Sequence, residues 1–155
     1  MASKTKLEEL VNRRTEQLER SQLEMLTRLA KAAEYRDDEA GEHIWRVAHL
    51  SAQLAQELGQ DTHYITLILR AARLHDVGKV GIPDAILMKP GKLSGTEFES
   101  IQNHTRIGAQ LLSGGHSPLI KMAETIALTH HEHWDGNGYP RKLTGEAIPL
   151  DGRIL

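Results

Sequence analysis

Residues 61–79 read DTHYITLILRAARLHDVGK and predict a helix that carries a histidine on its buried face. The side chain of Asp61 suits the position that caps the amino end of a helix. Apolar residues then recur at helical spacing, so that one face carries Ile65, Ile68, Ala72 and His75. We expect this helix to end near Asp76, which places an imidazole and an adjacent carboxylate at the interior of the fold.

The segments on either side predict more helices and no strand of useful length. Ser94 and Glu97 form a capping box that opens one helix, and the Ser117–Pro118 pair opens the next. Residues 76–93 and the chain after Trp134 are punctuated by Gly and Pro and are expected to be loops. The predicted helices span about residues 2–34, 39–58, 61–76, 94–113 and 117–133. We therefore expect an all-α fold, built as a helical bundle.

The composition limits the classes of function. A length of 155 residues favours one domain. Lys and Arg total 19 and Asp and Glu total 21, so the formal net charge is −2 and no overall basic field exists to attract nucleic acid or a membrane surface. The absence of cysteine excludes disulfides, thiolate zinc sites and cysteine nucleophiles. No apolar run reaches the ~18 residues of a membrane helix and no signal sequence opens the chain, so we expect a cytoplasmic protein.

The first predicted helix is long and has no Gly or Pro. Its apolar residues recur every seven positions at Val11, Leu18, Met25 and Ala32, but the alternate seam is mostly polar, so the coiled-coil pattern is partial. Two interpretations stay open: a solvated helix docked on its own domain, or a connector that forms a homodimer or joins an upstream module. We divide the chain into this connector at residues 1–33 and a domain at 34–155.

The chain has nine histidines, and five of them fall on apolar faces of predicted helices. Buried imidazoles need hydrogen-bond partners, and metal ions satisfy several at once because a neutral ring nitrogen is a good ligand. Nitrogen and oxygen donors without sulfur suit Fe, Mn, Co, Ni, Zn or Mg. The candidates exceed one tetrahedral site and favour two metals; they are His43, His75, Asp76, His104, His130 and His131, with Glu39 as an additional candidate.

The remaining histidines and one lysine have different expectations. Lys79 follows Asp76 across Gly78, which we interpret as a turn that leaves room near the metals. We expect the ammonium of Lys79 to lie beside a metal-bound anion. The histidines expected on the surface are His49, His63, His116 and His133.

Two motifs resemble those of a known family. Residues 75–79, HDVGK, resemble the HD-x-G-K motif of HD-superfamily phosphohydrolases. Residues 130–140, HHEHWDGNGYP, resemble the longer and more specific HHExxDGxGYP motif of the HD-GYP subfamily. The resemblance covers about residues 32–155 and implies a bundle of the HD phosphohydrolase type.

The resemblance also implies an activity. Family members hold two or three metals, often iron or manganese, and active members hydrolyse the bacterial second messenger cyclic di-GMP to pGpG or GMP. This implies a metal-dependent phosphodiesterase in signal transduction, as found in response regulators. It gives catalytic roles to Asp76 and to Lys79, which in the motif contacts the scissile phosphate or protonates the leaving oxygen. The matching metal ligands are the candidates named above, with Glu39 matching the further ligand of trinuclear members.

The loop that names the subfamily implies contacts with partners as well as a role in shaping the site. Its matching residues are Asp135, Gly136, Gly138, Tyr139 and Pro140. GGDEF-type or other signalling proteins are the partners that this resemblance implies, and a cyclic dinucleotide is the implied substrate.

The family pattern continues beyond the position of Leu155 with another ligand Asp and with basic residues that bind phosphate. We therefore expect this chain to lack the C-terminal part of the domain. This leaves other functions open: a signalling module that binds metal or nucleotide without turnover, an enzyme for another cyclic dinucleotide, or a di-iron redox sensor or oxygenase.

Overall fold

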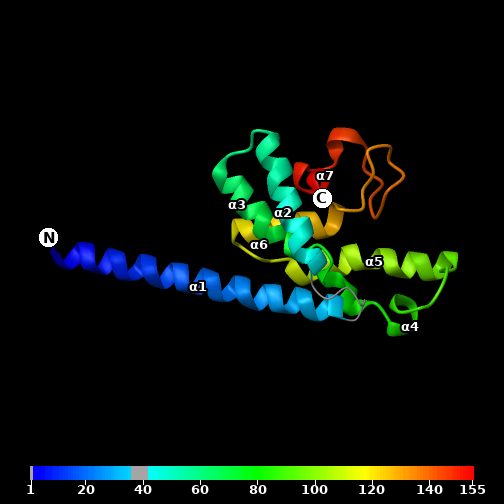
Figure 1. The fold of residues 1–155 in the computed structure, drawn as a ribbon, viewed down its shortest axis with the longest axis horizontal. Helices are drawn as coiled ribbons and strands as arrows, with labels where there is room; N and C mark the ends of the chain where they lie inside the picture. Colours follow the sequence, from blue (N-terminus) through cyan, green and yellow to red (C-terminus); the bar gives the residue numbers. More distant parts are fainter. Residues whose placement is uncertain (1, 36–41) are drawn as a thin grey trace.

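The computed structural model describes residues 2–35 and 42–155, and the described chain consists of helices joined by loops (Figure 1). Its α-helices are α1 (Ala2–Glu34), α2 (Glu42–Glu57), α3 (Thr62–Ala71), α4 (Asp84–Leu87), α5 (Gly95–Leu112), α6 (Pro118–Thr129) and α7 (Leu150–Ile154). Its 3₁₀-helices are η2 (Ala72–Leu74), η3 (Val77–Gly81) and η4 (Gly145–Ala147). Within the described ranges β pairing is limited to one isolated bridge between Asp135 and Thr144. The expected all-α class is confirmed.

The core lies where α2, α3, α5 and α6 pack together. Its largest fully buried apolar side chains include Ile44, Ile68, Leu74 and Ile126. Burial of one such side chain stabilises the fold by about 1.5–3 kcal/mol. Small residues at the same contacts, such as Ala71, Ala123 and Ala127, let the helix backbones approach closely.

Three of the predicted helix starts are confirmed, and a local hydrogen bond fixes each of them. Asp61 accepts from the backbone N–H of Tyr64 at 2.8 Å. The backbone N–H of Ser94 donates to the Glu97 carboxylate at 2.7 Å, which completes the predicted capping box of α5. The side chain of Ser117 likewise caps α6.

The helix ends and the short helices differ from the prediction. The helix expected over 61–76 is α-helical only to Ala71 and tightens into η2, and α6 ends at Thr129 instead of near His133. Two segments expected to be loops contain η3, α4, η4 and α7. These elements span at most 5 residues each, which is too short to display a helical period in sequence. The early end of α6 matters because His130 and His131 leave the helix there.

Only the C-terminal part of α1 packs on the bundle, and the rest extends beyond it (Figure 1). Ala30 and Ala33 are buried, whereas Leu18 and Met25 are about 60% exposed. No helix in the described part of the chain has the length and apolar character needed to cross a bilayer.

Candidate metal centre

Helix ends and one helix interior place the candidate ligands around a common point. His43 lies in the first turn of α2, and His104 lies in the middle of α5. His75 directly follows η2 and Asp76 directly precedes η3. His130 caps the C-terminus of α6, with His131 next to it. Four separate segments therefore contribute to one site.

Asp76 lies at the centre of this arrangement and is buried. Its Oδ1 lies 3.2 Å from Nε2 of His104 and 3.4 Å from Nε2 of His130. Its Oδ2 lies 3.3 Å from Nε2 of His75 and 2.9 Å from Nζ of Lys79. Both carboxylate oxygens are thus within reach of ligands from different helices.

The other nitrogen of each ring determines which tautomer is present. Nδ1 of His75 lies 2.8 Å from the carbonyl oxygen of Ala72, and Nδ1 of His104 lies 2.7 Å from that of Ile101. Nδ1 of His130 lies 3.0 Å from the carbonyl oxygen of Ile126. A carbonyl only accepts, so each Nδ1 carries a proton, and in the neutral form of each ring the lone pair lies at Nε2.

These lone pairs converge on each other and on a carboxylate. Nε2 of His104 lies 3.3 Å from Nε2 of His130, so an acceptor faces an acceptor. Oδ1 of Asp76 is buried and has no hydrogen-bond partner within the described structure. Facing acceptors repel unless a cation or a proton lies between them. The residues present therefore fit a divalent cation.

The ligand atoms separate into two groups that share one carboxylate. Asp76, His104, His130 and His131 form the first group, and His43, His75 and Asp76 form the second. In each group the ligand atoms lie within 4.8 Å of one another. A carboxylate that belongs to both groups can bridge two ions, so the geometry suits a two-metal site.

The protonation states agree with metal binding. Burial raises the pKa of Asp76, but hydrogen bonds from His104, His130 and His75, made when a proton lies between each Nε2 and the carboxylate, lower it by more, so the carboxyl is ionised. Burial lowers the pKa of His130. Burial, followed by the charge of His130, lowers the pKa of His131 to about 3. An anionic carboxylate and neutral rings are the ligand forms that metals require.

Gly78 allows two elements to pack closely, which differs from the role expected from the sequence. A Cβ atom at this position would overlap the backbone of His104 and of Gly108. The glycine therefore lets η3 lie directly against α5, which brings Asp76 next to His104. The interpretation of Gly78 as a turn that leaves room for metals is wrong, since the space is filled by α5.

The loop at 135–140 contributes an aromatic ring to the centre. Tyr139 stacks on His131 with ring centroids 4.7 Å apart, and its backbone N–H donates to the His131 carbonyl at 3.0 Å. Burial, followed by the charge of Asp76, raises the pKa of Tyr139 to about 12, so the phenol keeps its proton. Gly138 packs where a side chain would meet the backbone of His133.

The other predicted loop residues shape the loop and attach it to α5. Asp135 is exposed and accepts hydrogen bonds from Asn137 at 2.9 Å, so it serves the shape of the loop. Gly136 has φ +78°, which favours glycine. The carbonyl of Pro140 accepts from Arg106 at 3.0 Å, which ties the loop to α5.

Sequence reasoning missed the structural use of Glu132. This buried carboxylate accepts from the backbone N–H groups of Arg141 and Leu143 at 2.7 and 2.8 Å. It therefore holds the far end of the loop that carries Tyr139. Its place within a run of histidines is the sequence signal, but the partners lie 9 and 11 residues away and no local pattern indicates them.

The remaining predicted positions are Glu39 and the four histidines expected on the surface. Glu39 lies outside the described residues. The four histidines expected on the surface, His49, His63, His116 and His133, are all exposed.

Comparisons with known proteins agree with this geometry. A family profile described as "HD domain" matches residues 7–155. A protein of Thermotoga maritima named cyclic di-GMP phosphodiesterase is 49% identical over 132 residues, which cover 85% of this chain and 36% of that protein. The Xanthomonas campestris cyclic di-GMP phosphodiesterase response regulator RpfG is 45% identical over 139 residues, or 90% of this chain and 37% of its own.

A third relative carries a different name. The 3'3'-cGAMP-specific phosphodiesterase 2 of Vibrio cholerae is 46% identical over 131 residues, which cover 84% of this chain and 25% of that protein. The chain thus spans about a third or less of the length of these relatives.

Proposed function

Because the chain belongs to the HD domain family and carries the HD-GYP pattern, we propose that it is the catalytic domain of a metal-dependent phosphodiesterase. Its substrate is cyclic di-GMP, which it hydrolyses to pGpG or GMP in bacterial second-messenger signalling. The relatives named above support this substrate class. The single observation that carries the proposal is the convergence of bare Nε2 atoms on the unpartnered oxygen of Asp76.

The proposal assigns each ligand group to one metal ion. His43, His75 and Asp76 would hold one ion, and Asp76, His104, His130 and His131 would hold the other. Glu39 is proposed as a further ligand. Iron and manganese are the proposed metals, because the resemblance to the HD-GYP subfamily implies them and the nitrogen and oxygen donors are compatible with both. When bound, such ions activate water and neutralise charge on a phosphodiester.

The protein groups around the ions position the substrate and its protons. Lys79 has its ammonium 2.9 Å from Oδ2 of Asp76 and its side chain is 19% exposed, so it is held at the edge of the site. From there it can donate a proton or a hydrogen bond to the leaving ribose oxygen. Tyr139 stays protonated and covers one face of His131, which fixes that ring. No side chain needs to form a covalent intermediate.

The test measures metal content and turnover on the same samples. The chain is purified under reducing conditions, loaded with Fe(II) or Mn(II), and incubated with cyclic di-GMP. We expect His75→Ala and Asp76→Ala to lose bound metal and turnover together. His49→Ala, which removes an exposed imidazole from α2, is the matched control and keeps both. Full turnover in either ligand variant would contradict the mechanism.

The substrate base is tested in the same assay. The Vibrio cholerae relative is named as specific for 3'3'-cGAMP, which makes that dinucleotide the competing substrate. We expect faster hydrolysis of cyclic di-GMP than of 3'3'-cGAMP at equal concentration. The reverse order would keep the metal chemistry and change the substrate.

A second candidate function is a signalling module that binds metal or nucleotide without turnover. The large exposed side chains of Phe98 and Trp134 near the loop at 135–140 favour it, because they suit contacts with a protein such as a GGDEF-type partner. We also propose that residues 1–33 form a connector to another module. We propose the cytoplasm as the location of the protein. Tight metal binding with no hydrolysis of either dinucleotide would support this alternative.

A further inference from the structure

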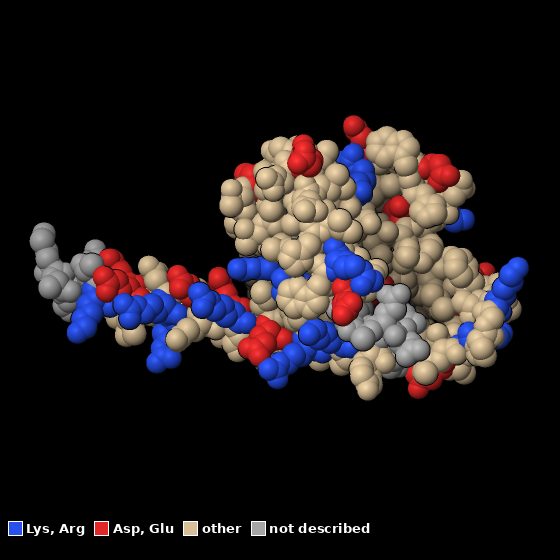
Figure 2. Space-filling view, in the orientation of Figure 1, with Lys and Arg blue, Asp and Glu red and all other residues tan. Residues whose placement is uncertain are grey.

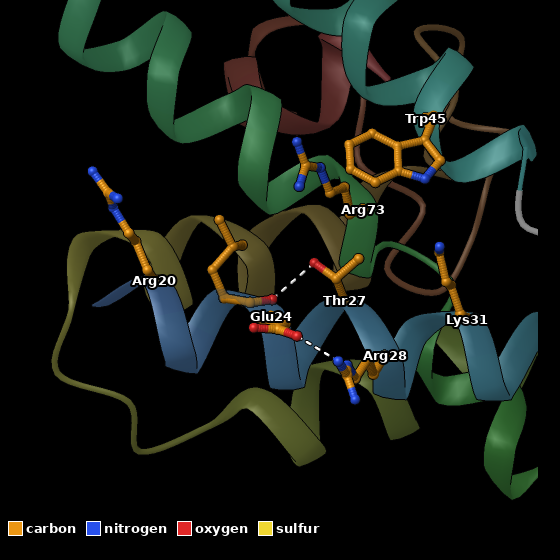
Figure 3. Close-up of a pocket in the computed structure, with 8 residues that line it drawn as sticks. Arg20, Glu24, Thr27, Arg28, Lys31, Trp45 and Arg73 are labelled. Atoms are coloured by element: carbon orange, nitrogen blue, oxygen red, sulfur yellow. Dashed lines mark hydrogen bonds and ion pairs between the residues drawn. The ribbon is translucent and has the colours of Figure 1, made fainter. Parts of the chain in front are cut away.

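A basic hollow lies at the junction between α1 and the bundle, and none of its lining residues is a candidate metal ligand. It has a volume of about 410 Å³. Its charged and aromatic lining residues are Arg20, Glu24, Arg28 and Lys31 of α1, Trp45 of α2 and Arg73 of η2. Figure 3 shows the side chains of α1 facing Arg73 and Trp45 across this space. Figure 2 shows basic side chains, interleaved with acidic ones, along α1 to the same junction.

Most of the positive charge in the hollow is not neutralised by the residues that the structure describes. Glu24 is the acidic residue of the lining, and it is bound to Arg28 (Figure 3). Arg20, Lys31 and Arg73 form no ion pair with any residue that the structure describes. Three cationic side chains therefore border the hollow without a compensating carboxylate, because Glu24 is bound to Arg28.

Arg73 gives a second, independent indication. Its guanidinium lies 4.1 Å from the centre of the Trp45 ring, while Lys31 lies 5.8 Å from the same ring. The buried Nε of Arg73 has no hydrogen-bond partner in the described structure. Stacking on tryptophan holds this guanidinium in place with donors to spare.

The arrangement of the cations selects the kind of ligand. Arg20 and Lys31 are 11 positions apart on α1, or roughly 16 Å along the helix axis, and Arg73 lies across from them. One phosphate group cannot contact all three, whereas a chain of phosphates can. Guanidinium and ammonium groups bind phosphate oxygens by charge-assisted hydrogen bonds. We propose that this hollow binds a small polyphosphate ligand, either inorganic or the phosphate chain of a nucleotide.

Such a ligand would connect two parts of the molecule. Arg20 and Lys31 belong to α1, whereas Arg73 belongs to η2, which directly precedes His75. A ligand that binds all three stabilises the docked position of α1. This inference does not depend on the proposed phosphodiesterase activity, because it concerns different residues.

The experiment is a calorimetric titration of the full chain, free of metal, with sodium triphosphate at physiological ionic strength. We expect one saturable site. Arg20→Gln and Lys31→Gln should each weaken binding about tenfold, the loss of one charge-assisted contact. Both residues are exposed, so these variants keep the fold. The matched control is Arg14→Gln, which removes the same charge from α1 outside the hollow and should keep the affinity.

Further arms separate the possible outcomes. Equal weakening by Arg14→Gln would show attraction to net charge only and would overturn the proposal, as would an absence of binding. Weakening by Lys79→Gln without an effect of Arg20→Gln would assign the triphosphate to the metal centre and overturn it as well. GTP is titrated in parallel: tighter binding than triphosphate supports a nucleotide as the occupant, and equal binding supports recognition of the phosphate chain alone.

Discussion

At the scale of single residues, the carboxylate of Asp76 makes the metal-free form of the centre energetically unfavourable. Its Oδ1 is buried without a hydrogen-bond partner in the described structure and faces Nε2 atoms of His104 and His130. The metal-free protein therefore holds an unfavourable set of facing acceptors, which the rest of the fold compensates. Residues that are good metal ligands therefore lower the stability of the metal-free protein.

Asp76→Asn tests this conflict between binding and stability. The amide of Asn can donate to the bare nitrogens, so we expect the metal-free variant to be at least as stable as the metal-free parent. We also expect it to lose most of its bound metal, because a neutral amide is a weaker ligand than a carboxylate. Thermal unfolding in EDTA and elemental analysis measure the two effects. A large loss of stability in EDTA would indicate a structural role for the carboxylate instead.

At the scale of elements, the contact between η3 and α5 positions the centre. Gly78 lies against the backbone of His104 and Gly108, so this contact has no room for a side chain. The same elements carry Asp76 and Lys79 on one side and His104 on the other. The distance between ligands from different helices therefore depends on one glycine.

Gly78→Ala should separate the two elements. We expect a loss of at least about 2 kcal/mol in the free energy of unfolding, together with weaker metal binding. Gly95→Ala is the control, because a Cβ there meets nothing within 4 Å and it replaces a glycine inside α5. The control should be neutral or slightly stabilising. Urea unfolding of both variants compares them directly, and equal stability would contradict the packing argument.

The start of α5 gives a dependence on pH. The hydrogen bond from Lys89, and then those from Ser94, lower the pKa of Glu97 to about 2 from an ordinary value of 4.5. A carboxyl with a lowered pKa stabilises the fold above its unfolded pKa, and this contribution is lost as the pH falls through the window from 4.5 to about 2.

Glu97→Gln removes that contribution. We expect the variant to have a lower thermal midpoint than the parent at pH 7 and a smaller difference as the pH approaches 3, below the ordinary pKa of Glu. Glu99→Gln, an exposed neighbour on the same helix, is the control. A difference that stays constant across this pH range would rule out the ionised capping box as its cause.

At the scale of the whole molecule, most of the apolar residues of α1 do not pack on the bundle. Its C-terminal end is packed, but Leu7, Val11, Leu18 and Met25 are between 53% and 61% exposed. They form one apolar stripe on a helix that projects beyond the bundle (Figure 1). An exposed stripe at heptad spacing is typical of a helix that pairs with another helix.

The stripe leads us to expect self-association of this chain. Leu18→Glu combined with Met25→Glu places charges on the stripe and should convert a dimer to a monomer in sedimentation equilibrium. The matched control is Leu50→Glu combined with Leu58→Glu, two exposed leucines of the bundle, which should leave the dimer unchanged. A parent chain that stays monomeric at high concentration would contradict this prediction.

The sequence by itself determined the features that depend on neighbours in the chain. Helix starts at Asp61, Ser94 and Ser117 follow from hydrogen bonds that span three residues, so they could be predicted. Helical periodicity placed the histidines on buried faces, and their chemistry indicated metal before any fold was known. The motif spacing at 75–79 and 130–140 indicated the family.

The tertiary structure alone decided how those residues meet. The end of α6 at Thr129 lets His130 and His131 both face the centre, and helix ends depend on packing as much as on local sequence. Glu132 finds its partners 9 and 11 residues away, and Gly78 packs against a helix that follows much later in the chain. Such contacts depend on the relative positions of elements, which no local pattern of residues contains. For that reason the ligand types and a carboxylate able to bridge two ions could be predicted, while the facing lone pairs could not.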